Sequence, residues 1–550
     1  MANVTFDYTN LVEVEGGIGD GELRDLHPRL EQENRSPTHA WVAPDTENRS
    51  DRYSARHSPW RVFSPRRAGL DALSVCSGKR RIPEDRVATK EIQEERIRQL
   101  NDKYVREGDY VLYWMQEAQR VEYNHALEYA VQRANELGQR LLVVFGLTDG
   151  YPEANLRHYA FLLEGLQDVR EDLKERKIKF VARRGSPDEV ALNAGKNASL
   201  IVCDMSYLRL QKEWREKVAE GADCLVVQVE TEVVVPVELA SNKQEHAART
   251  LRPRIQEHLD EFLVELEPTA VEKQSLNMKD GGLDLSDVGE ILDDMELDRS
   301  VAPMSHLYRG GTKAAKKILE DFIKNRLDTY VEHRNQPQTD DVSHMSKYLH
   351  YGHVSPVYVA LKIREANHPQ EDLDSYLEEI IVRRELSMNF CHYTPDYDEF
   401  SSLPGWAKET LKEHEKDGRD PVYTREQLEK AETHDEYWNA AMNEMRYTGY
   451  MHNYMRMYWG KKILEWGASP EEAYETTLYL NNKYFVDGRD PNSYANVAWV
   501  FGQHDRGWQE RTVFGKVRYM SAGGLERKAK PEEYVEKVER LIEEGRAEAL

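Results

Sequence analysis

Five short apolar runs between residues 109 and 230 constrain the fold of this chain more than any other feature. Each is rich in Val, Ile and Leu without polar alternation, which is typical of strands buried on both faces of a sheet. Stretches with helical periodicity, such as 117–137 and 156–175, separate the runs. The pattern predicts an α/β domain, a doubly wound parallel sheet with helices on both faces. The runs are DYVLYWM (109–115), RLLVVFGLT (140–148), IKFVARRG (178–185), SLIVCDMS (199–206) and CLVVQVE (224–230).

The chain changes character on either side of this region. From residue 314 onward it is almost wholly helical, with apolar residues near a 3.6-residue period in 314–334, 374–390 and 443–467. The first 95 residues are rich in Arg, Ser, Pro, Asp and Glu, which predicts a disordered extension, with a basic arm that contacts nucleic acid as the alternative. We therefore expect an extension (1–95), an α/β domain (105–240), an acidic linker (241–312), a large helical domain (313–535) and a C-terminal tail (536–550).

Charge and composition limit the class of protein. Asp and Glu number 99 against 75 Lys and Arg, so the formal net charge is −24, which argues against coating nucleic acid but allows a local basic groove. No apolar run has the length of a membrane helix, and the N-terminus lacks the pattern of a secretory signal. The four cysteines are not spaced for zinc or for a disulfide framework, and no glycine-rich phosphate loop follows a strand. We expect a cytoplasmic protein, associated with the nucleoid if it is prokaryotic, without a metal site.

Tryptophans are unusually dense in the C-terminal third. Trp459 and Trp466 are seven residues apart, which separates them by roughly 10 Å along one helical face. Core packing is one interpretation, because Trp is usually mostly buried. The alternative is a relay of electrons between spaced indole rings. The other tryptophans of this region are Trp438, Trp499 and Trp508.

Polar residues in apolar or turn-rich segments indicate a candidate ligand site. Arg456 lies among aromatic and apolar residues, where a guanidinium needs a carboxylate or an anionic ligand. The turn-rich segment 480–499 contains Asp487 and Arg489. An internal Arg–Asp ion pair is one interpretation. A polar loop that grips a planar heterocycle through Asn481 and Asp487 is the other.

Two further segments have both a structural and a functional interpretation. Ser343 and Ser346 precede a helical run, where hydroxyls serve either as ordinary N-caps or as ligands of a phosphate. Glu379 and Arg383 are four residues apart in a helical pattern. They form either an exposed salt bridge worth about 0.3–0.5 kcal/mol or a carboxylate in a cleft with arginines that reach phosphates.

These segments together resemble the photolyase/cryptochrome family, most closely its class II cyclobutane pyrimidine dimer photolyases. The resemblance covers about 105–530, and several long motifs occur in the same order as in the family. The motifs are YWMQEAQRVEYNHAL (113–127), EHAARTLRPRI (245–255), SHMSKYLHYGHVSP (343–356), VRRELSMNFCHY (382–393), THDEYWNAA (433–441), MHNYMRMYWGKKILEW (451–466), NNKYFVDGRDPNSYA (481–495) and FGKVRYMS (514–521).

The resemblance implies an α/β antenna domain followed by a helical domain that holds U-shaped FAD. Reduced FAD would use blue light to split a pyrimidine dimer that is flipped out of UV-damaged DNA. It also implies a carbon–carbon lyase, monomeric and outside membranes, with a deazaflavin, a folate or no pigment as antenna. The alternatives are a blue-light photoreceptor that binds FAD without repair, and repair of (6-4) photoproducts by paired pocket histidines, with His504 and either His350 or His353 as weak candidates.

The positions of residues within these motifs imply which residues bind the cofactor. Asn481 resembles the residue that faces flavin N5, and Asp487 paired with Arg456 resembles the group beside the polar edge of the ring. Trp438, Trp459 and Trp466 resemble the tryptophans through which class II photolyases photoreduce their flavin. The other expected FAD contacts are Tyr330, Ser343, His344, Met345, Ser346, Gly488 and Arg489.

Position also implies the substrate residues. Glu379 resembles the carboxylate that hydrogen-bonds the bases of the dimer, and Arg383 stands where some branches place a tryptophan against the dimer. Met457, Trp499 and Trp508 resemble the apolar walls of the dimer pocket, although the loop 498–508 is one residue shorter than is usual. Arg334 and Asn335 resemble contacts to the DNA backbone. A local basic patch is expected from Arg446, Lys461, Lys462, Arg489, Arg506, Arg511, Lys516 and Arg518.

Overall fold

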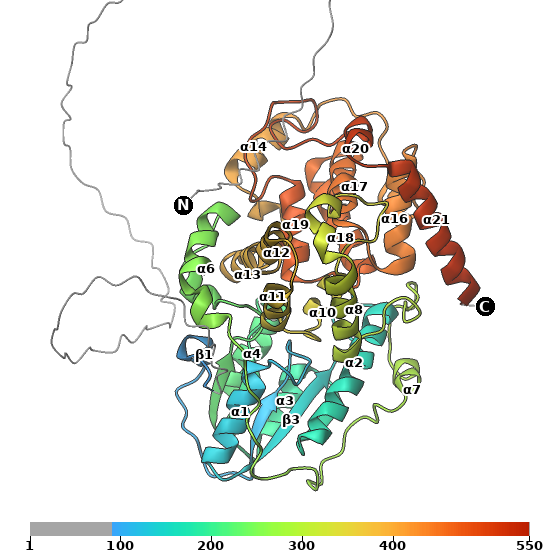
Figure 1. The fold of residues 1–550 in the computed structure, drawn as a ribbon. Coiled ribbons are helices and arrows are strands. Elements are labelled where there is room, and N and C mark those ends of the chain that lie inside the picture. The colour runs from blue at the N-terminus through green and yellow to red at the C-terminus, as the bar shows by residue number, and fades with distance from the viewer. Residues whose placement is uncertain (1–90, 549–550) are drawn as a thin grey trace, which may run out of the picture. The chain divides into compact units, whose positions relative to one another are not determined.

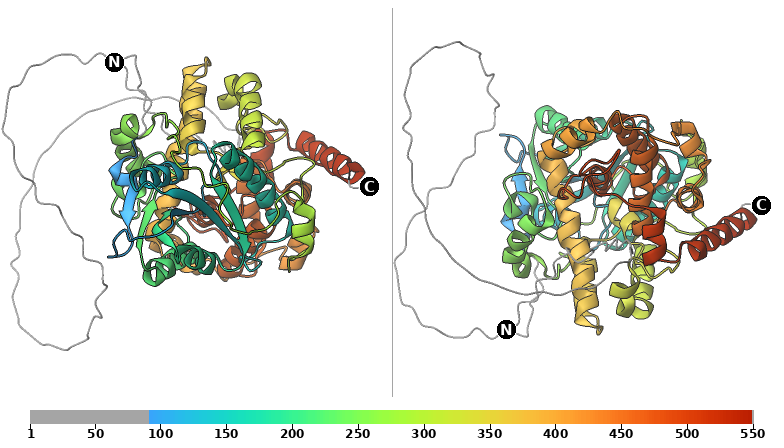
Figure 2. Two further views of the ribbon diagram at one scale, coloured as in Figure 1. Left: turned by 90° about the horizontal axis from the view of Figure 1, so that it is seen from below. Right: turned by 90° about the horizontal axis from the view of Figure 1, so that it is seen from above.

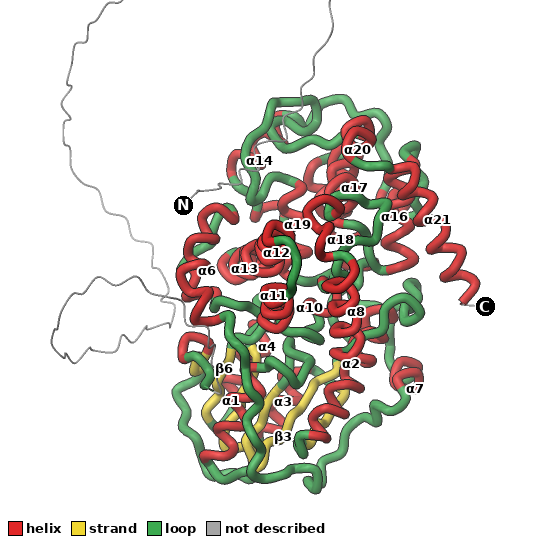
Figure 3. Tube along the Cα trace, viewed as in Figure 1, coloured by secondary structure: helices red, strands yellow, loops and turns green. Residues whose placement is uncertain are grey.

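A computed structural model of the protein describes residues 91–548, so almost all of the expected extension lies outside the described residues. One compact unit contains all of them. Figure 1 shows a sheet flanked by helices at one end of this unit and a large assembly of helices at the other. Figure 3 shows that the strands are confined to the first end. The structure therefore confirms the predicted fold class, an α/β part followed by an all-α part.

The sheet has six strands in the order β1-β6-β5-β2-β3-β4. The five strands from β2 to β6 are parallel, and each coincides with one of the five apolar runs, although β5 begins one residue earlier, at Ala198. The chain order reverses between β2 and β5, and ligands of such sheets bind at the carboxyl ends of the strands near this switch point. The bounds are β1 Ile97–Gln99, β2 Tyr110–Trp114, β3 Arg140–Leu147, β4 Lys179–Arg184, β5 Ala198–Asp204 and β6 Leu225–Val229.

The edge strand β1 is the one strand of the described chain that the sequence did not predict. It pairs antiparallel with β6, and Ile97 lies opposite Val229. Its three residues, IRQ, are too few and too polar to form an apolar run. The prediction from periodicity therefore failed at the exposed edge, where burial imposes no pattern on the sequence.

Helices cover both faces of the sheet, as Figure 2 shows in the view from below. Helices α1 (His125–Glu136) and α2 (Leu156–Glu175) pack on one face, and α3 (Pro187–Gly195) and α4 (Arg209–Gly221) on the other. The expected helix 117–137 begins only at His125, so that prediction was wrong for its first turns. Residues 116–118 form a loop instead, because the buried carboxylate of Asp204 accepts hydrogen bonds from three consecutive backbone N–H groups there, at 2.5–2.9 Å.

The helical part contains most of the remaining elements. None of the described helices is both long and apolar enough to cross a membrane. The bounds are α5 Val237–Ala240, α6 Ala248–Phe262, α7 Val288–Asp293, α8 Thr312–Asn325, α9 Tyr330–His333, α10 Ser346–His350, α11 Pro356–Glu365, α12 Gln370–Leu377, α13 Arg384–Tyr393, α14 Gly405–Glu413, α15 Arg425–Glu429, α16 Glu436–Thr448, α17 Asn453–Trp466, α18 Pro470–Tyr484, α19 Pro491–Val500, α20 Ala522–Lys528 and α21 Pro531–Glu548.

All three expected long helices are interrupted, and within 314–334 helix α8 ends at Asn325 before α9 begins at Tyr330. The other two are interrupted next to candidate site residues. The helix expected over 443–467 is divided into α16 and α17, because Gly449 ends α16 in the left-handed conformation with φ +70°. The helix expected over 374–390 contains a π-helical segment, Glu378–Arg383, between α12 and α13. Such segments occur frequently at functional sites. Both interruptions place candidate site residues at irregular points of the chain.

The expected linker and tail contain regular structure. Helices α6 and α7 lie within 241–312, and α21 extends from Pro531 through most of 536–550. Tyr534 and Val538 are buried in the core of the helical part. Lys537 on the same helix donates hydrogen bonds to the carbonyl oxygens of Pro337 and Thr339. The end of the described chain is thus joined to the loop that precedes α10.

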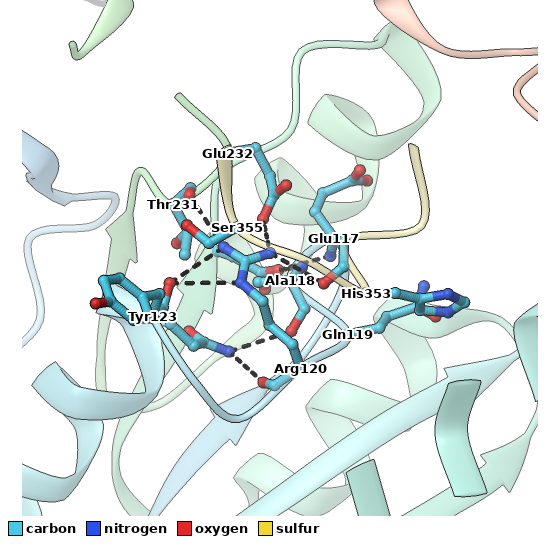
Figure 4. Close-up of polar contacts among 12 residues, drawn as sticks. Glu117, Ala118, Gln119, Arg120, Tyr123, Thr231, Glu232, His353 and Ser355 are labelled. Carbon is cyan, nitrogen blue, oxygen red and sulfur yellow. Dashed lines mark hydrogen bonds and ion pairs between the residues drawn. The ribbon is translucent and has the colours of Figure 1, made fainter. Parts of the chain in front are cut away.

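Arg120 joins the two parts of the unit (Figure 4). Its guanidinium is buried and donates to Glu232 Oε1 at 2.6 Å, to the Gly352 carbonyl at 3.0 Å and to the Thr231 carbonyl at 3.2 Å. Gly352 has φ +65°, and a Cβ there would lie 1.8 Å from the Glu117 carbonyl oxygen. The α/β part therefore fixes the position of the chain that follows α10.

Candidate functional site

A bidentate ion pair is the centre of the candidate site. Arg456 on α17 donates to both carboxylate oxygens of Asp487, at 3.0 and 3.1 Å. Burial alone would raise the pKa of Asp487, but the charge and hydrogen bonds of Arg456 outweigh it and the pKa lies below its usual value. The guanidinium also lies 3.9 Å from the ring centre of Phe485. The carboxylate is therefore ionised and the pair is rigidly held.

The loop after α18 brings Asn481 to the same place. A Cβ on Gly488 would lie 2.9 Å from the carbonyl oxygens of both Asn481 and Phe485, so only glycine lets the loop fold this closely against the helix end. Asn481 is buried, and no described donor bonds its Oδ1. Asn481 and Asp487 thus lie in one site, as the polar-loop interpretation predicted, and the internal ion pair is also present.

The segment before α10 reaches the ion pair from the other side. Helix α10 begins at Ser346, and its N-cap is Met345, whose side chain makes no capping hydrogen bond. Ser346 is exposed and its hydroxyl bonds Asp487. Ser343 is half-buried, and its hydroxyl accepts from the backbone N–H of Met345, the N-cap residue, at 3.4 Å. The serine hydroxyls are therefore not used as ordinary N-caps of this helix.

Lys347 is a charged residue of the site that the sequence analysis missed. Its side chain is buried, with Nζ 3.9 Å from the ring centre of Tyr308 and 4.9 Å from that of Tyr450. Burial lowers the pKa of Lys347 to about 7, although Asp487 opposes the shift. The available signal was a lysine inside MSKYLHY, a run that is mostly apolar and aromatic.

His344 and Tyr330 support this segment. Burial and the neighbouring Lys347 lower the pKa of His344 to about 4, although its Nε2 lies 3.0 Å from Asp340 Oδ1. The neutral ring also contacts Tyr450, with the ring centres 4.7 Å apart. Tyr330 is buried against Phe322 and Tyr376, so the structure gives it a packing role beside Ser343.

These groups fit an anionic ligand with a planar polar ring. The free Asn481 Oδ1 offers a hydrogen-bond acceptor, and the Arg456–Asp487 pair offers donors and acceptors to a ring edge. Two serine hydroxyls and the buried Lys347 ammonium suit a diphosphate. The donor set therefore matches a dinucleotide that carries a heterocycle.

The three tryptophans of α16 and α17 form a continuous contact. The rings of Trp438 and Trp466 are 5.7 Å apart, and Trp438 Nε1 donates to the Trp459 carbonyl at 3.0 Å. Trp459 contacts Phe485 at 6.3 Å, and Trp466 contacts Tyr423 at 5.5 Å. All three tryptophans are buried. The contact joins the loop of the ion pair to Tyr423, and its geometry suits both core packing and an electron relay.

The π-helical segment changes the expected pairing of Glu379. Arg383 donates to Glu378, at 3.2 Å, and not to Glu379, so the predicted i,i+4 pair was wrong. The reason is the wider turn, which brings residues five apart into register. Glu379 instead accepts from Arg334 Nη2 at 2.6 Å and is about one-third exposed. Asn335 is exposed beside Arg334.

Arg518 links the two tryptophans that were expected to wall a pocket. Its guanidinium lies 4.1 Å from the ring centre of Trp508 and 5.6 Å from that of Trp499. Asp505 accepts from Arg518 and from Trp508 Nε1. The shorter loop thus still brings Trp508 into one cluster with Trp499. Met457 is half-buried at the edge of the same hydrophobic core as Trp499.

Several predicted residues lie elsewhere. Arg489 is buried and points toward the α/β part, where its Nη1 lies 3.0 Å from His158 Nε2, so a contact of its side chain with the ion-pair site is not present. Lys461 and Lys462 are also buried and cannot belong to a surface patch. Among the residues expected in that patch, Arg506 and Lys516 are exposed.

The three candidate pocket histidines each have a different internal partner. His350 pairs with Asp490 at 3.1 Å, and His504 lies 3.0 Å from the His246 carbonyl. His353 accepts from the Gly311 N–H at 3.0 Å. No contact between any two of these histidines occurs among the described residues, so the geometry does not provide the histidine pair of the (6-4) alternative.

A second candidate ligand site is a cavity of about 120 Å³ at the carboxyl ends of β2 and β3. Buried amide atoms of Gln116, Gln119 and Gln211 in its lining have no hydrogen-bond partner among the described residues. Such atoms are costly to leave unpaired, so this cavity also fits a polar ligand. The cavity could not be predicted from the sequence, because at least five separate segments of the chain contribute its lining. The lining of the cavity also includes Tyr151, Tyr159, Trp214, His350, Tyr351 and Arg489.

Known proteins resemble this chain in sequence and in fold. The family model described as DNA photolyase matches residues 111–273. A deoxyribodipyrimidine photo-lyase of Methanothermobacter thermautotrophicus is 48% identical over 454 residues, which are 82% of this chain and 100% of that protein. A class III photolyase of Agrobacterium tumefaciens has a TM-score of 0.63 at 19% identity, over 78% of this chain and 86% of that one. A photolyase of Sulfolobus tokodaii, solved with two FAD molecules and an implied light-harvesting cofactor, has a TM-score of 0.59 at 15% identity, over 78% and 89% of the chains.

Proposed function

Because this chain belongs to the DNA photolyase family, we propose that it repairs cyclobutane pyrimidine dimers in UV-damaged DNA with light. FAD is the cofactor of this proposal, held between α10, α17 and the loop after α18. When bound, reduced and excited by light, FAD would supply an electron to the cyclobutane ring and would take it back once the ring has split. The observation that carries the proposal is the Arg456–Asp487 pair, with Asn481 and Lys347 beside it.

Each residue of this site has a role that follows from its chemistry. Asn481 presents an amide to the flavin, and the Arg456–Asp487 pair orients the polar edge of the ring. Ser343, Ser346 and Lys347 bind the diphosphate, because hydroxyls and an ammonium donate hydrogen bonds to anionic oxygens. The contact Trp466–Trp438–Trp459 is the proposed route by which electrons reach oxidised cofactor.

The substrate side contains Glu379 and the Trp499–Arg518–Trp508 cluster. Glu379 hydrogen-bonds the bases of the extruded dimer, and Arg334 holds its carboxylate in place. Trp499, Trp508 and Met457 form the apolar walls that receive the lesion. Arg334, Asn335, Arg383, Arg506 and Lys516 contact the DNA backbone, so affinity should fall as salt rises. Class II membership and the monomeric state remain predictions.

The test is repair of a thymine-dimer oligonucleotide by the reduced holoprotein under blue light. We expect the absorbance of intact thymine to recover, and Glu379→Ala to lower the quantum yield of repair about tenfold, because the carboxylate would no longer hydrogen-bond the bases of the dimer. Glu378→Ala is the matched control, because this neighbouring carboxylate pairs with Arg252 and Arg383.

Three outcomes separate the proposal from its alternatives. Bound FAD without recovery of thymine would instead indicate a photoreceptor. Repair confined to a (6-4) substrate would contradict the proposed lesion. Equal loss of yield in both glutamate variants would remove Glu379 from its proposed role.

A second chromophore site has independent support. The cavity at the carboxyl ends of β2 and β3 has aromatic walls and three glutamines with unpaired amide atoms. A planar heterocycle with donor and acceptor edges would stack on those walls and satisfy those amides. We assign this cavity to a light-harvesting pigment, with a deazaflavin preferred because its polar ring edge fits the glutamines.

A further inference from the structure

Two consecutive buried asparagines, Asn481 and Asn482, lie in the last turn of helix α18, which ends at Tyr484. The carbonyl oxygen of the Asn482 side chain, Oδ1, accepts from the backbone N–H of Arg489 and from Asn481 Nδ2, both at 3.0 Å. Its Nδ2 donates to Glu153 Oε2 at 2.5 Å. Its backbone carbonyl accepts from Arg489 Nη1 at 2.8 Å. Every polar atom of the side chain therefore has a partner.

This network determines which way both amides face. A backbone N–H can only donate, so the atom of Asn482 that faces Arg489 must be the oxygen. The carboxylate of Glu153 can only accept, which places the Asn482 NH₂ group at the opposite end. Asn481 faces the same Asn482 oxygen and must present its own NH₂ group there. Oδ1 of Asn481 is the atom left for a ligand.

We propose that Asn482 is a positioning residue, which holds Asn481 so that a carbonyl oxygen and not an NH₂ group faces the flavin. The inference rests on the proposed function, in which Asn481 meets the flavin ring. An acceptor at that place favours the N5-protonated, reduced ring over the oxidised ring, whose N5 is itself an acceptor. Asn482 thereby favours the redox state that repair requires.

The backbone around Asn482 is shaped for this contact. Arg489 has φ +63° and Glu153 has φ +58°, left-handed conformations that strain a residue with a side chain. Both residues form a hydrogen bond with the side-chain amide of Asn482. Glu153 precedes α2 of the α/β part, so that part contributes directly to the orientation of a cofactor residue.

The decisive variant is Asn482→Leu, which keeps the side-chain size and removes the acceptor. We expect the purified FAD-loaded variant to lose about tenfold in its preference for reduced over oxidised FAD, which lowers the two-electron midpoint potential by about 30 mV. Asn389→Leu is the matched control. Asn389 is equally buried and bonds Glu245 and Lys243, away from the ion-pair site, so its loss should leave the potential unchanged.

A milder variant protects the test against misfolding. Glu153→Ala removes the acceptor of Asn482 Nδ2 at an exposed residue, and we expect a smaller shift of the potential in the same direction. Unchanged potentials in Asn482→Leu, or in Glu153→Ala if the first variant does not fold, would overturn the inference. A shift of equal size in Asn389→Leu would also overturn it. Failure of the wild type to bind FAD or repair dimers would instead overturn the proposed function.

Discussion

At the scale of single residues, burial determines the chemistry of two lysines. Lys347 and Lys461 are both buried, and no described carboxylate lies within ion-pair distance of either ammonium. Aromatic rings and backbone carbonyls surround them instead, and burial lowers the pKa of each to about 7. Near neutral pH, both lysine side chains are therefore partly deprotonated.

Lys347 should make stability depend on pH in the alkaline range. Its pKa is about 7 in the folded protein and about 10.4 in an unfolded chain. Between these values the unfolded chain binds more protons, so this group adds stability as pH rises. We expect the unfolding free energy of wild-type apoprotein to rise relative to Lys347→Met by up to about 1.4 kcal/mol per pH unit from pH 7 to 10. Denaturant titrations at several pH values measure it, and a pH-independent difference would contradict it.

The sequence predicted which residue types form the site better than it predicted how deeply each residue is buried. Asn481, Arg456 and Asp487 were predicted together because polar groups in an apolar segment need partners, and the structure brings them together. Arg489 and Lys461 were placed at the cofactor and at the surface, and both are buried elsewhere. The sequence does not show whether a basic residue of a helix faces solvent or a buried carbonyl group. Only the packing of the folded chain distinguishes an exposed lysine from a buried one.

At the scale of elements, the β2–α1 loop shows how one carboxylate shapes the connection to the site. Asp204 fixes the loop through three N–H groups, and the Glu117 carbonyl then lies against Gly352. The strands around this loop were predictable because burial on both faces imposes continuous apolar runs. The loop was not, because its conformation depends on an aspartate some 87 residues away in the sequence.

Gly352→Ala should therefore disrupt the contact between the two parts of the unit. A Cβ would lie 1.8 Å from the Glu117 carbonyl at a residue with φ +65°, so strain and overpacking add. We expect a loss of about 2–5 kcal/mol in unfolding free energy. Gly405→Ala is the control, because a Cβ at this first residue of α14 meets no atom within 4 Å. Thermal and denaturant unfolding measure both variants, and equal stability of the two would contradict the prediction.

At the scale of the whole molecule, there are two candidate ligand sites, and the cavity lies where the α/β part meets the helical part. The loop 487–490 connects them, because Asp487 belongs to the ion-pair site while Arg489 lines the cavity. Because the net charge is −24, the chain as a whole repels DNA phosphates. Any attraction must therefore come from locally exposed cations, such as Arg506 and Lys516. The cavity could not be predicted from the sequence, because its glutamines have no motif and meet only after folding.

Pigment binding in the cavity tests the arrangement of the molecule as a whole. Gln116 has both side-chain polar atoms buried and unpaired, so a bound ring would gain two hydrogen bonds from it. At about 1 kcal/mol for each bond, Gln116→Leu should weaken binding of a deazaflavin roughly tenfold or more, as fluorescence titration of the FAD-loaded protein would measure. Gln139→Leu is the control, since Gln139 precedes β3 at the opposite edge of the sheet and its Oε1 is also buried and unpaired. Equal affinity in the two variants would place the pigment elsewhere, and binding of a folate in preference to the deazaflavin would replace the assigned pigment.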